Sequence, residues 1–141
     1  DKGINLVPVG KEALRAIHRA LSNNELVAVA ADRDILRSGA KVEFFGEETT
    51  LPDAPAVLAM RTGALVLPVR SLRYGNGTYS VEIRPPIDLQ FTGNLKDDIR
   101  VNTQRITSAL ESLISEHPEQ WVVFEPVWNV HKERANMPLA S

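Results

Sequence analysis

Two carboxylates and a guanidinium follow directly after an apolar run in the first third of the sequence. Asp32, Arg33 and Asp34 come after residues 25–31, in which only Glu25 is charged. In open α/β sheets, ligand sites collect at the carboxyl ends of parallel strands. Carboxylates that flank a guanidinium suit the binding of a polar head group or the orientation of a catalytic base. The alternative, that all three are solvated turn or helix-cap residues, stays open here.

The segment from residue 42 to 46 carries two adjacent aromatic residues, Phe44 and Phe45, after Glu43. Aromatic rings bury much area in apolar clefts, so the pair suits the lining of an acyl-chain tunnel. Adjacent phenylalanines also seal the edge of a core, and the residue types do not decide between the two. A second aromatic group, Trp121, Phe124 and Trp128, suits contact with lipid or a partner, although packing of the last strand is the favoured interpretation.

Several classes of catalytic site have no counterpart in this sequence. There is no phosphate-cradling glycine loop, no histidine spacing typical of a metal site and no serine nucleophile elbow. The lack of cysteine excludes thiolate nucleophiles, disulfides and Cys-ligated zinc, and it suits a reducing compartment. We expect the three histidines, His18, His117 and His131, to be surface or helix-end residues.

Size and composition are those of one α/β or α+β domain. The chain has 141 residues, of which 43% are hydrophobic and 24% charged. A net charge of −2 gives no overall field that would attract nucleic acid or an anionic bilayer. The longest apolar runs are of strand length, far below the roughly 20 residues of a membrane helix. The sequence starts at Asp1 without a signal-peptide pattern, so we expect a fragment or a processed chain.

The elements that must position these residues alternate between strands and helices. Continuous apolar runs typical of buried parallel strands predict strands over 25–31 and 64–69, and shorter runs predict strands over 4–9 and 121–124. Apolar stripes and cap residues predict helices over 10–21, 53–63 and 94–117. Asn76-Gly77 predicts a hairpin between residues 72–74 and 79–83. Residues 35–50 are predicted as a loop with one extended piece, 42–46, and a glycine turn. The pattern predicts an α/β fold with a mixed, mainly parallel sheet.

The segments that hold these residues resemble the lysophospholipid acyltransferase superfamily. Within it, they are most similar to lipid A biosynthesis acyltransferases and phosphatidylinositol mannoside acyltransferases. The resemblance covers residues 3 to 130, and its motifs are ADRDILRSG at 31–39, VEFFGE at 42–47, Leu51-Pro52, RTGA at 61–64, HPEQW at 117–121 and PVW at 126–128. The last of these motifs is more like the mannoside-acylating branch.

The resemblance implies an αβα sandwich that moves a fatty acyl group from a thioester donor to a hydroxyl group. The donor would be acyl-CoA or acyl carrier protein, and the acceptor a membrane glycolipid or lysophospholipid at the cytoplasmic face of the membrane. It implies no cofactor, no metal and no nucleic acid. Residues 1–130 would be the C-terminal part of the acyltransferase domain and 131–141 a polar tail. Peripheral membrane contact would come from an N-terminal part outside this sequence.

The resemblance also implies roles for particular residues. Asp32 stands where related mannoside acyltransferases carry an active-site acid, so it would support the catalytic base or the acceptor. Arg33 and Asp34 would form the polar end of the substrate site. Glu43, Phe44 and Phe45 would also bind substrate, with the aromatic pair as part of the acyl tunnel.

One motif of the family is missing, which leaves three interpretations of function open. In the family, a catalytic His is followed after four residues by an acid, and His18, His117 and His131 are followed at that spacing by Asn23, Val122 and Asn136. We therefore expect this chain to be inactive alone and to form part of a longer acyltransferase. The alternatives are a non-catalytic lipid- or carrier-binding module and a structural domain that associates through an exposed sheet edge.

Overall fold

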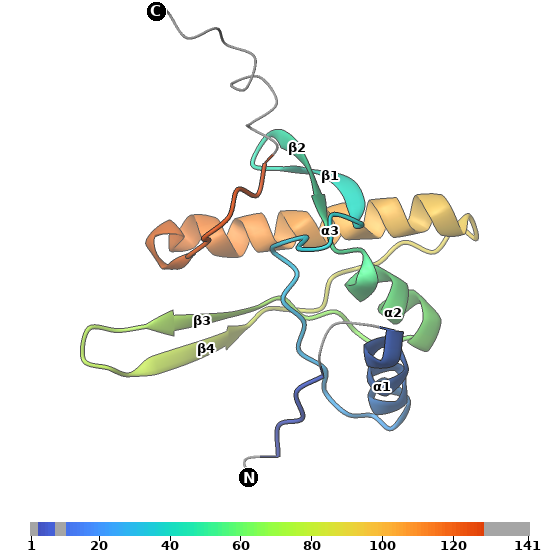
Figure 1. Ribbon diagram of the computed structural model, residues 1–141, viewed down its shortest axis with the longest axis horizontal. Coiled ribbons are helices and arrows are strands. Elements are labelled where there is room, and N and C mark those ends of the chain that lie inside the picture. The colour runs from blue at the N-terminus through green and yellow to red at the C-terminus, as the bar shows by residue number, and fades with distance from the viewer. Residues whose placement is uncertain (1–2, 8–10, 129–141) are drawn as a thin grey trace, which may run out of the picture.

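The computed structural model describes residues 3–7 and 11–128. Its elements, in chain order, are α1 (Lys11–Ser22), β1 (Ala40–Phe44), β2 (Glu47–Leu51), α2 (Ala54–Thr62), β3 (Val69–Arg73), β4 (Tyr79–Ile83), α3 (Leu95–Glu116) and the 3₁₀ helix η1 (Pro118–Gln120). The long helix α3 crosses the molecule, with the β1–β2 hairpin on one side of it and the β3–β4 hairpin on the other (Figure 1).

All three predicted helices are confirmed, although the side chain of Asp53 forms no capping hydrogen bond at the start of α2. The side chain of Asn94 accepts a hydrogen bond from the backbone N–H of Asp97, which caps the first turn of α3. Gly63 ends α2 in the left-handed region, with φ of 72°, where glycine carries no steric penalty. The predicted tail 131–141 lies outside the described residues.

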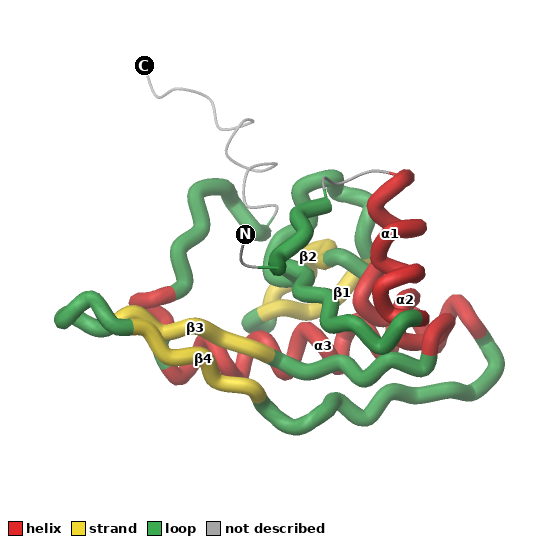
Figure 2. The backbone as a smooth tube through the Cα atoms, turned by 90° about the horizontal axis from the view of Figure 1, so that it is seen from below, coloured by secondary structure: helices red, strands yellow, loops and turns green. Residues whose placement is uncertain are grey.

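The two sheets are separate antiparallel hairpins, shown in yellow in Figure 2. The β3–β4 hairpin confirms the prediction from Asn76-Gly77. The β1–β2 hairpin corrects the prediction of a loop over residues 35–50. Its two-residue turn holds Phe45 and Gly46 at φ of 54° and 80°, as a type I′ turn requires. The predicted glycine turn is confirmed at Gly46, but a bulky residue at positive φ is an outlier, so Phe45 does not indicate a two-residue hairpin turn.

The predicted parallel strands are not formed in the described part of the chain, which is α/β with two small antiparallel sheets. Residues 4–7, 25–31, 64–68 and 121–124 form no strand there, and no two described strands pair in parallel. Strand 4–9 also includes residues that the structure does not describe. The segment 66–68 instead continues the β3–β4 hairpin, since the N–H groups of Arg84 and Ile87 each donate at 2.9 Å to the carbonyls of Pro68 and Val66. An apolar run becomes a parallel strand only beside a partner strand.

The core lies where the first hairpin packs on α3. Val42, Phe44 and Leu51 are buried, and the residues that cover them are Ile114, Trp121, Val127 and Trp128. The hairpin is also tied to the C-terminal segment, because the Thr49 hydroxyl donates to the carbonyl of Val127. Alternation along β1 and β2 thus directs one apolar face onto α3, as period-two patterning requires.

Three amide side chains each bind both backbone groups of one residue, and we call these contacts amide brackets. Gln104 binds Glu43 at 2.8 and 2.9 Å. Gln120 binds Arg73 at 2.9 and 3.0 Å, and Asn102 binds Gln90 at 2.7 and 2.8 Å. The first two brackets each satisfy the backbone groups of one residue on the outer edge of β1 and of β3, where a further strand would otherwise pair.

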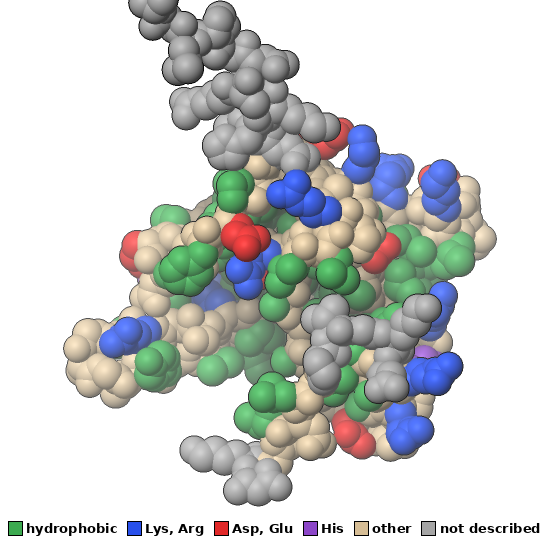
Figure 3. All heavy atoms as spheres, in the orientation of Figure 1, with side chains coloured by type: hydrophobic (Ala, Val, Ile, Leu, Met, Phe, Trp, Pro, Cys, Tyr) green, Lys and Arg blue, Asp and Glu red, His purple; other side chains and the backbone are tan. Residues whose placement is uncertain are grey.

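Apolar side chains remain exposed away from this core. Leu26 is 96% exposed and Leu65 is 73% exposed, although both belong to predicted buried strands. Figure 3 shows hydrophobic side chains spread over the face of the molecule between β3–β4 and α2. In the described part of the chain, no helix combines the length and the apolar character needed to cross a membrane.

Candidate functional site

A cavity of about 270 Å³ lies between the predicted catalytic carboxylate, β3 and the C-terminal end of α3. Its apolar wall consists of Val29, Ala30, Ala31, Val69, Leu72, Leu110, Leu113 and Ile114. Its polar wall consists of Asp32, Arg70, Ser71, His117, Gln120 and Trp121. A small set of polar groups in a mainly apolar concavity is the usual composition of a small-molecule site.

Asp32 lines this cavity and is held by one hydrogen bond. The indole N–H of Trp121 donates to its Oδ2 at 2.9 Å. Within residues 3–7 and 11–128, the other carboxylate oxygen, Oδ1, accepts no hydrogen bond. The half-buried carboxylate therefore keeps one oxygen for a ligand or a catalytic base. Sequence reasoning missed this partner, because 89 residues separate Asp32 from Trp121.

The indole that holds Asp32 belongs to a group of four rings, Phe44, Phe45, Trp121 and Trp128, which we call the aromatic cluster. Trp121 meets Phe44 edge to face at a centroid distance of 5.8 Å, and it meets Trp128 in the same way at 6.2 Å. Such contacts add to the stabilisation from burial. The cluster thereby joins the predicted catalytic residue to the predicted aromatic pair, which the sequence presented as two unrelated motifs.

The carboxylate of Asp34 lies within its own loop. Its Oδ2 accepts the backbone N–H of Gly39 at 2.7 Å. Burial raises the pKa of Asp34, but hydrogen bonds from Gly39, the Thr50 side chain and the loop backbone outweigh burial and lower the pKa overall. Asp34 therefore fixes the loop that follows Asp32. Its neighbour Arg33 is half-buried and forms no ion pair with any described residue.

Glu43, Phe44 and Phe45 lie outside the cavity wall. Phe44 is fully buried, whereas Phe45 is 40% exposed and donates its backbone N–H to the carboxylate of Glu111 on α3. Glu43 is exposed and is anchored through its backbone by Gln104. The substrate-binding roles of Arg33, Asp34 and these three residues stay predictions.

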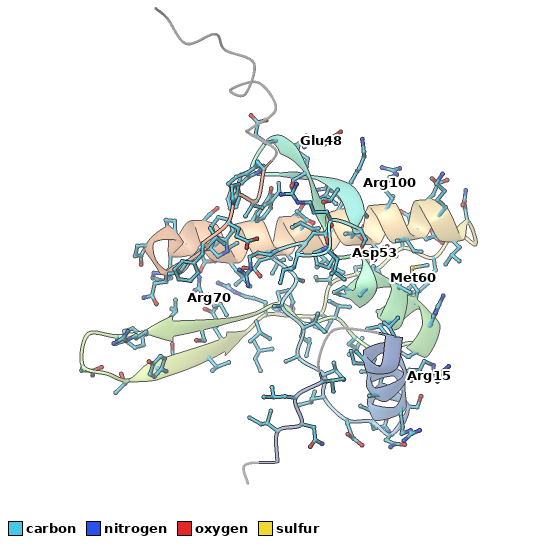
Figure 4. All side chains as sticks on the ribbon, in the orientation of Figure 1. Arg15, Glu48, Asp53, Met60, Arg70 and Arg100 are labelled. Carbon is cyan, nitrogen blue, oxygen red and sulfur yellow. The ribbon has the colours of Figure 1, made fainter. Side chains whose placement is uncertain are left out.

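Arg70 is a cavity residue that the sequence did not single out. It lies between β3 and α3 (Figure 4) and is held in an ion-pair quartet with Glu82, Arg84 and Glu116. Burial lowers the pKa of Arg70, but hydrogen bonds to Glu82 and Glu116 outweigh burial and raise it. Its Nη1 also donates to the carbonyl of Leu113 at 3.1 Å. With two carboxylates on it, this guanidinium ties the hairpin to the helix.

His117 also lines the cavity, and it forms a His–acid contact of a different spacing from the family motif. Its Nδ1 lies 3.2 Å from Oε1 of Glu119, two residues later. The pKa of Glu119 is lowered, first by its own backbone N–H and then by His117. Of the other histidines, His18 contacts Ser22 on α1, and His131 lies outside the described residues. Among the described residues, no group of His, Asp and Glu side chains has the arrangement of a metal site.

Comparison with known proteins agrees with these features. Residues 1–130 match the family described as bacterial lipid A biosynthesis acyltransferase. A phosphatidylinositol mannoside acyltransferase of Mycobacterium tuberculosis is 31% identical over 129 residues, which are 89% of this chain and 39% of that protein. A protein of the same name from Mycolicibacterium smegmatis is 33% identical over 108 residues, 77% of this chain and 34% of that protein.

The chain thus spans well under half the length of these relatives. The family match covers the cavity, the loop after Asp32 and the aromatic cluster together. This chain belongs to the bacterial lipid A biosynthesis acyltransferase family.

Proposed function

We propose that the protein takes part in the transfer of a fatty acyl group from a thioester, acyl-CoA or acyl carrier protein, to a hydroxyl group of a membrane glycolipid. The observation that carries the proposal is Asp32, half-buried at a cavity with one oxygen held by Trp121 and the other unused by the described residues. The names of the mannoside-acylating relatives support the acyl chemistry and a glycolipid acceptor.

The proposed chemistry needs a base for the acceptor hydroxyl and a carbonyl held beside it. The hydroxyl oxygen attacks the thioester carbonyl, an ester bond forms, the carbon–sulfur bond breaks, and the thiol leaves with the proton that the base removed. In this scheme, the free oxygen of Asp32 accepts a hydrogen bond from the acceptor or from the protonated base. The family's catalytic His–acid motif does not occur in the sequence, so we propose that this chain has no turnover by itself.

The same proposal extends to the architecture. We propose that residues 1–130 are the C-terminal part of an acyltransferase domain in which 25–31 and 64–69 pair into a mainly parallel sheet of an αβα sandwich. Exposed apolar residues in both segments, such as Leu26 and Leu65, support this. We further propose that the whole protein works at the cytoplasmic face of the membrane and attaches to it peripherally.

The test is Asp32→Asn in the protein expressed at the full length of its gene, assayed with an acyl thioester and a mannosylated phosphatidylinositol. We expect kcat to fall roughly ten-fold or more, because a group that supports acid–base catalysis is lost. The matched control is Asp88→Asn, since the side chain of Asp88 is fully exposed and, among the described residues, pairs with Arg105 at 3.8 Å. A folded Asp32→Asn protein with unchanged turnover would contradict the role of Asp32. Thioester binding without any turnover in the unaltered protein would favour a binding module.

A further inference from the structure

We infer that Trp121 is a positioning residue for Asp32, an inference that rests on the proposed function. The indole N–H is the only donor to the Asp32 carboxylate in the described part of the chain, at 2.9 Å from Oδ2. A hydrogen bond to an ionised acceptor is stronger than one between neutral groups. Trp121 therefore decides where the carboxylate points and which oxygen faces the cavity.

The indole can hold Asp32 because its own ring is fixed on several sides. Phe44 and Trp128 meet it edge to face, with interplanar angles of 89° and 80°. Phe45 lies against it at a centroid distance of 6.2 Å. Phe44 is fully buried, so at least one of these neighbours is itself immobilised by packing. A rotation of the indole would break these contacts as well as the hydrogen bond.

The backbone that carries Trp121 is fixed to the cavity wall. Trp121 directly follows η1, and its N–H donates to the carbonyl of Pro118 at 3.2 Å. The preceding residue, Gln120, forms the amide bracket on Arg73 of β3. Because β3 lines the cavity, this bracket sets the position of the indole relative to the site.

In contrast to the Trp121 ring, the Asp32 side chain is held in its orientation only weakly by its own backbone. Residues 25–31 form no strand in the described chain. Even where a ladder of hydrogen bonds fixes this segment in the full-length protein, it fixes the backbone and leaves the direction of the Asp32 carboxylate to the hydrogen bonds of the side chain. The contacts of Asp34 fix the loop only on the C-terminal side of Asp32. Since a misplacement of about 1 Å at a reacting group can cost 100-fold in rate, the orientation of this carboxylate should appear in kcat.

The cluster supplies a matched control for this inference. Trp128 belongs to the same four rings, and its indole N–H donates at 2.8 Å to the backbone carbonyl of Phe44. It makes no hydrogen bond to Asp32. Replacement of either tryptophan by phenylalanine keeps an aromatic ring and removes one N–H donor. Because Trp121 lines the cavity and Trp128 does not, a difference in kcat without a difference in KM reports the contact to Asp32 and not the packing of the cluster or a contact with the ligand.

The experiment compares Trp121→Phe with Trp128→Phe in the protein expressed at the full length of its gene. We expect Trp121→Phe to lower kcat about ten-fold, the loss expected from one charge-assisted hydrogen bond, with KM for the glycolipid within two-fold of the original. Trp128→Phe should leave kcat within about two-fold. Equal losses in the two variants, or a loss confined to KM, would overturn the inference.

A double variant separates this inference from the proposed function. If Trp121 acts through Asp32, Trp121→Phe should have no further effect on kcat in an Asp32→Asn protein. Additive losses would show that Trp121 acts independently, which overturns the inference. If Asp32→Asn itself leaves kcat unchanged, the proposed role of Asp32 fails first. If Asp32→Asn lowers kcat and Trp121→Phe does not, only the positioning role fails.

Exchange of the indole protons with deuterium tests the contact without any assay of turnover and without removal of a ring. In Asp32→Ala, we expect the Trp121 indole N–H to exchange at least ten-fold faster, while the Trp128 indole N–H keeps its rate. Equal rates for Trp121 with and without the carboxylate would contradict the hydrogen bond on which the inference depends. This measurement decides the question even where Trp121→Phe fails to fold.

Discussion

The strands of the two hairpins have the same length, but the two hairpins have opposite surroundings. In β1–β2, the apolar face is covered by α3 and by the aromatic cluster, so Val42, Phe44 and Leu51 are 4% exposed or less. In β3–β4, α3 contacts the charged face through the ion-pair quartet. The other face keeps Val81 67% exposed and Ile83 62% exposed.

This difference separates two ways of holding a strand pair. A two-stranded hairpin is only marginally stable without cover on one face. Apolar burial provides that cover in β1–β2, whereas β3–β4 combines one buried apolar residue, Leu72, with charges that salt and acid can weaken. Substitutions in the buried face of the β1–β2 hairpin should therefore lower the free energy of unfolding the most. Substitutions on the exposed face of the β3–β4 hairpin should lower it the least.

Phe44→Ala should have the largest effect. The side chain is fully buried and contacts both tryptophans of the aromatic cluster. Its truncation leaves a cavity, which costs about 3–5 kcal/mol in the free energy of unfolding. Urea titration measures the loss. Phe124→Ala is the control, since Phe124 is 88% exposed and should stay within about 0.5 kcal/mol. Equal losses at the two positions would contradict the assignment of the core.

Gly39→Ala should have the second-largest effect, because Gly39 directly precedes β1, the first strand of the β1–β2 hairpin. A Cβ atom at Gly39 would lie 2.0 Å from the carbonyl oxygen of Leu51, a distance that requires the backbone to shift. Overpacking of this kind costs about 1–3 kcal/mol. Thermal unfolding gives the comparison with Gly75→Ala in the second hairpin, where a Cβ atom meets nothing within 4 Å. A neutral Gly39→Ala would mean that the loop after Asp32 is not fixed as described.

The ion-pair quartet predicts that the stability contributed by the β3–β4 hairpin depends on pH. Burial raises the pKa of Glu116, but Arg70 and Arg84 outweigh burial and lower it below the ordinary value of 4.5. A lowered folded-state pKa adds stability that is present above pH 4.5 and is lost as the pH falls through that lower pKa. The difference between the urea midpoints at neutral pH and near pH 3 should be smaller for Glu116→Gln than for the original protein. A Glu116→Gln protein that loses as much stability in acid as the original would argue against the quartet.

Val81→Thr should have the smallest effect. With Val81 67% exposed, the added hydroxyl stays in water, and the free energy of unfolding of this chain should change by less than about 0.5 kcal/mol. The same change at buried Val42 should cost about 1–3 kcal/mol, because a hydroxyl then loses its water. Binding of a hydrophobic dye should fall in Val81→Thr and not in Val42→Thr. A large loss at Val81 would show that this face is covered.

Local signals predicted the helices and one hairpin, since Asn94, Gly63 and Asn76-Gly77 each act within a few residues. The apolar runs 25–31 and 64–69 correctly report residues that favour burial, but a run carries no information on which strand will pair with it. The β1–β2 hairpin is not predicted from the sequence, because phenylalanine is unusual at the positive φ that its turn requires at Phe45. Asp32 was predicted as a site residue from its place after an apolar run and from a family resemblance. Its contact with Trp121 joins distant parts of the chain, and no spacing rule reaches that far.

The amide brackets carry a consequence for the chemical ageing of the protein. Deamidation of Gln104 or Gln120 would replace an N–H donor with a carboxylate oxygen opposite the backbone carbonyl of Glu43 or Arg73. Attraction would become repulsion at that carbonyl, while the carboxylate could still accept the backbone N–H, so the outer edge of β1 or β3 would present an unpaired C=O to any neighbouring chain. A single hydrolysed side chain would thus expose one backbone acceptor on a strand edge, with no change in the core.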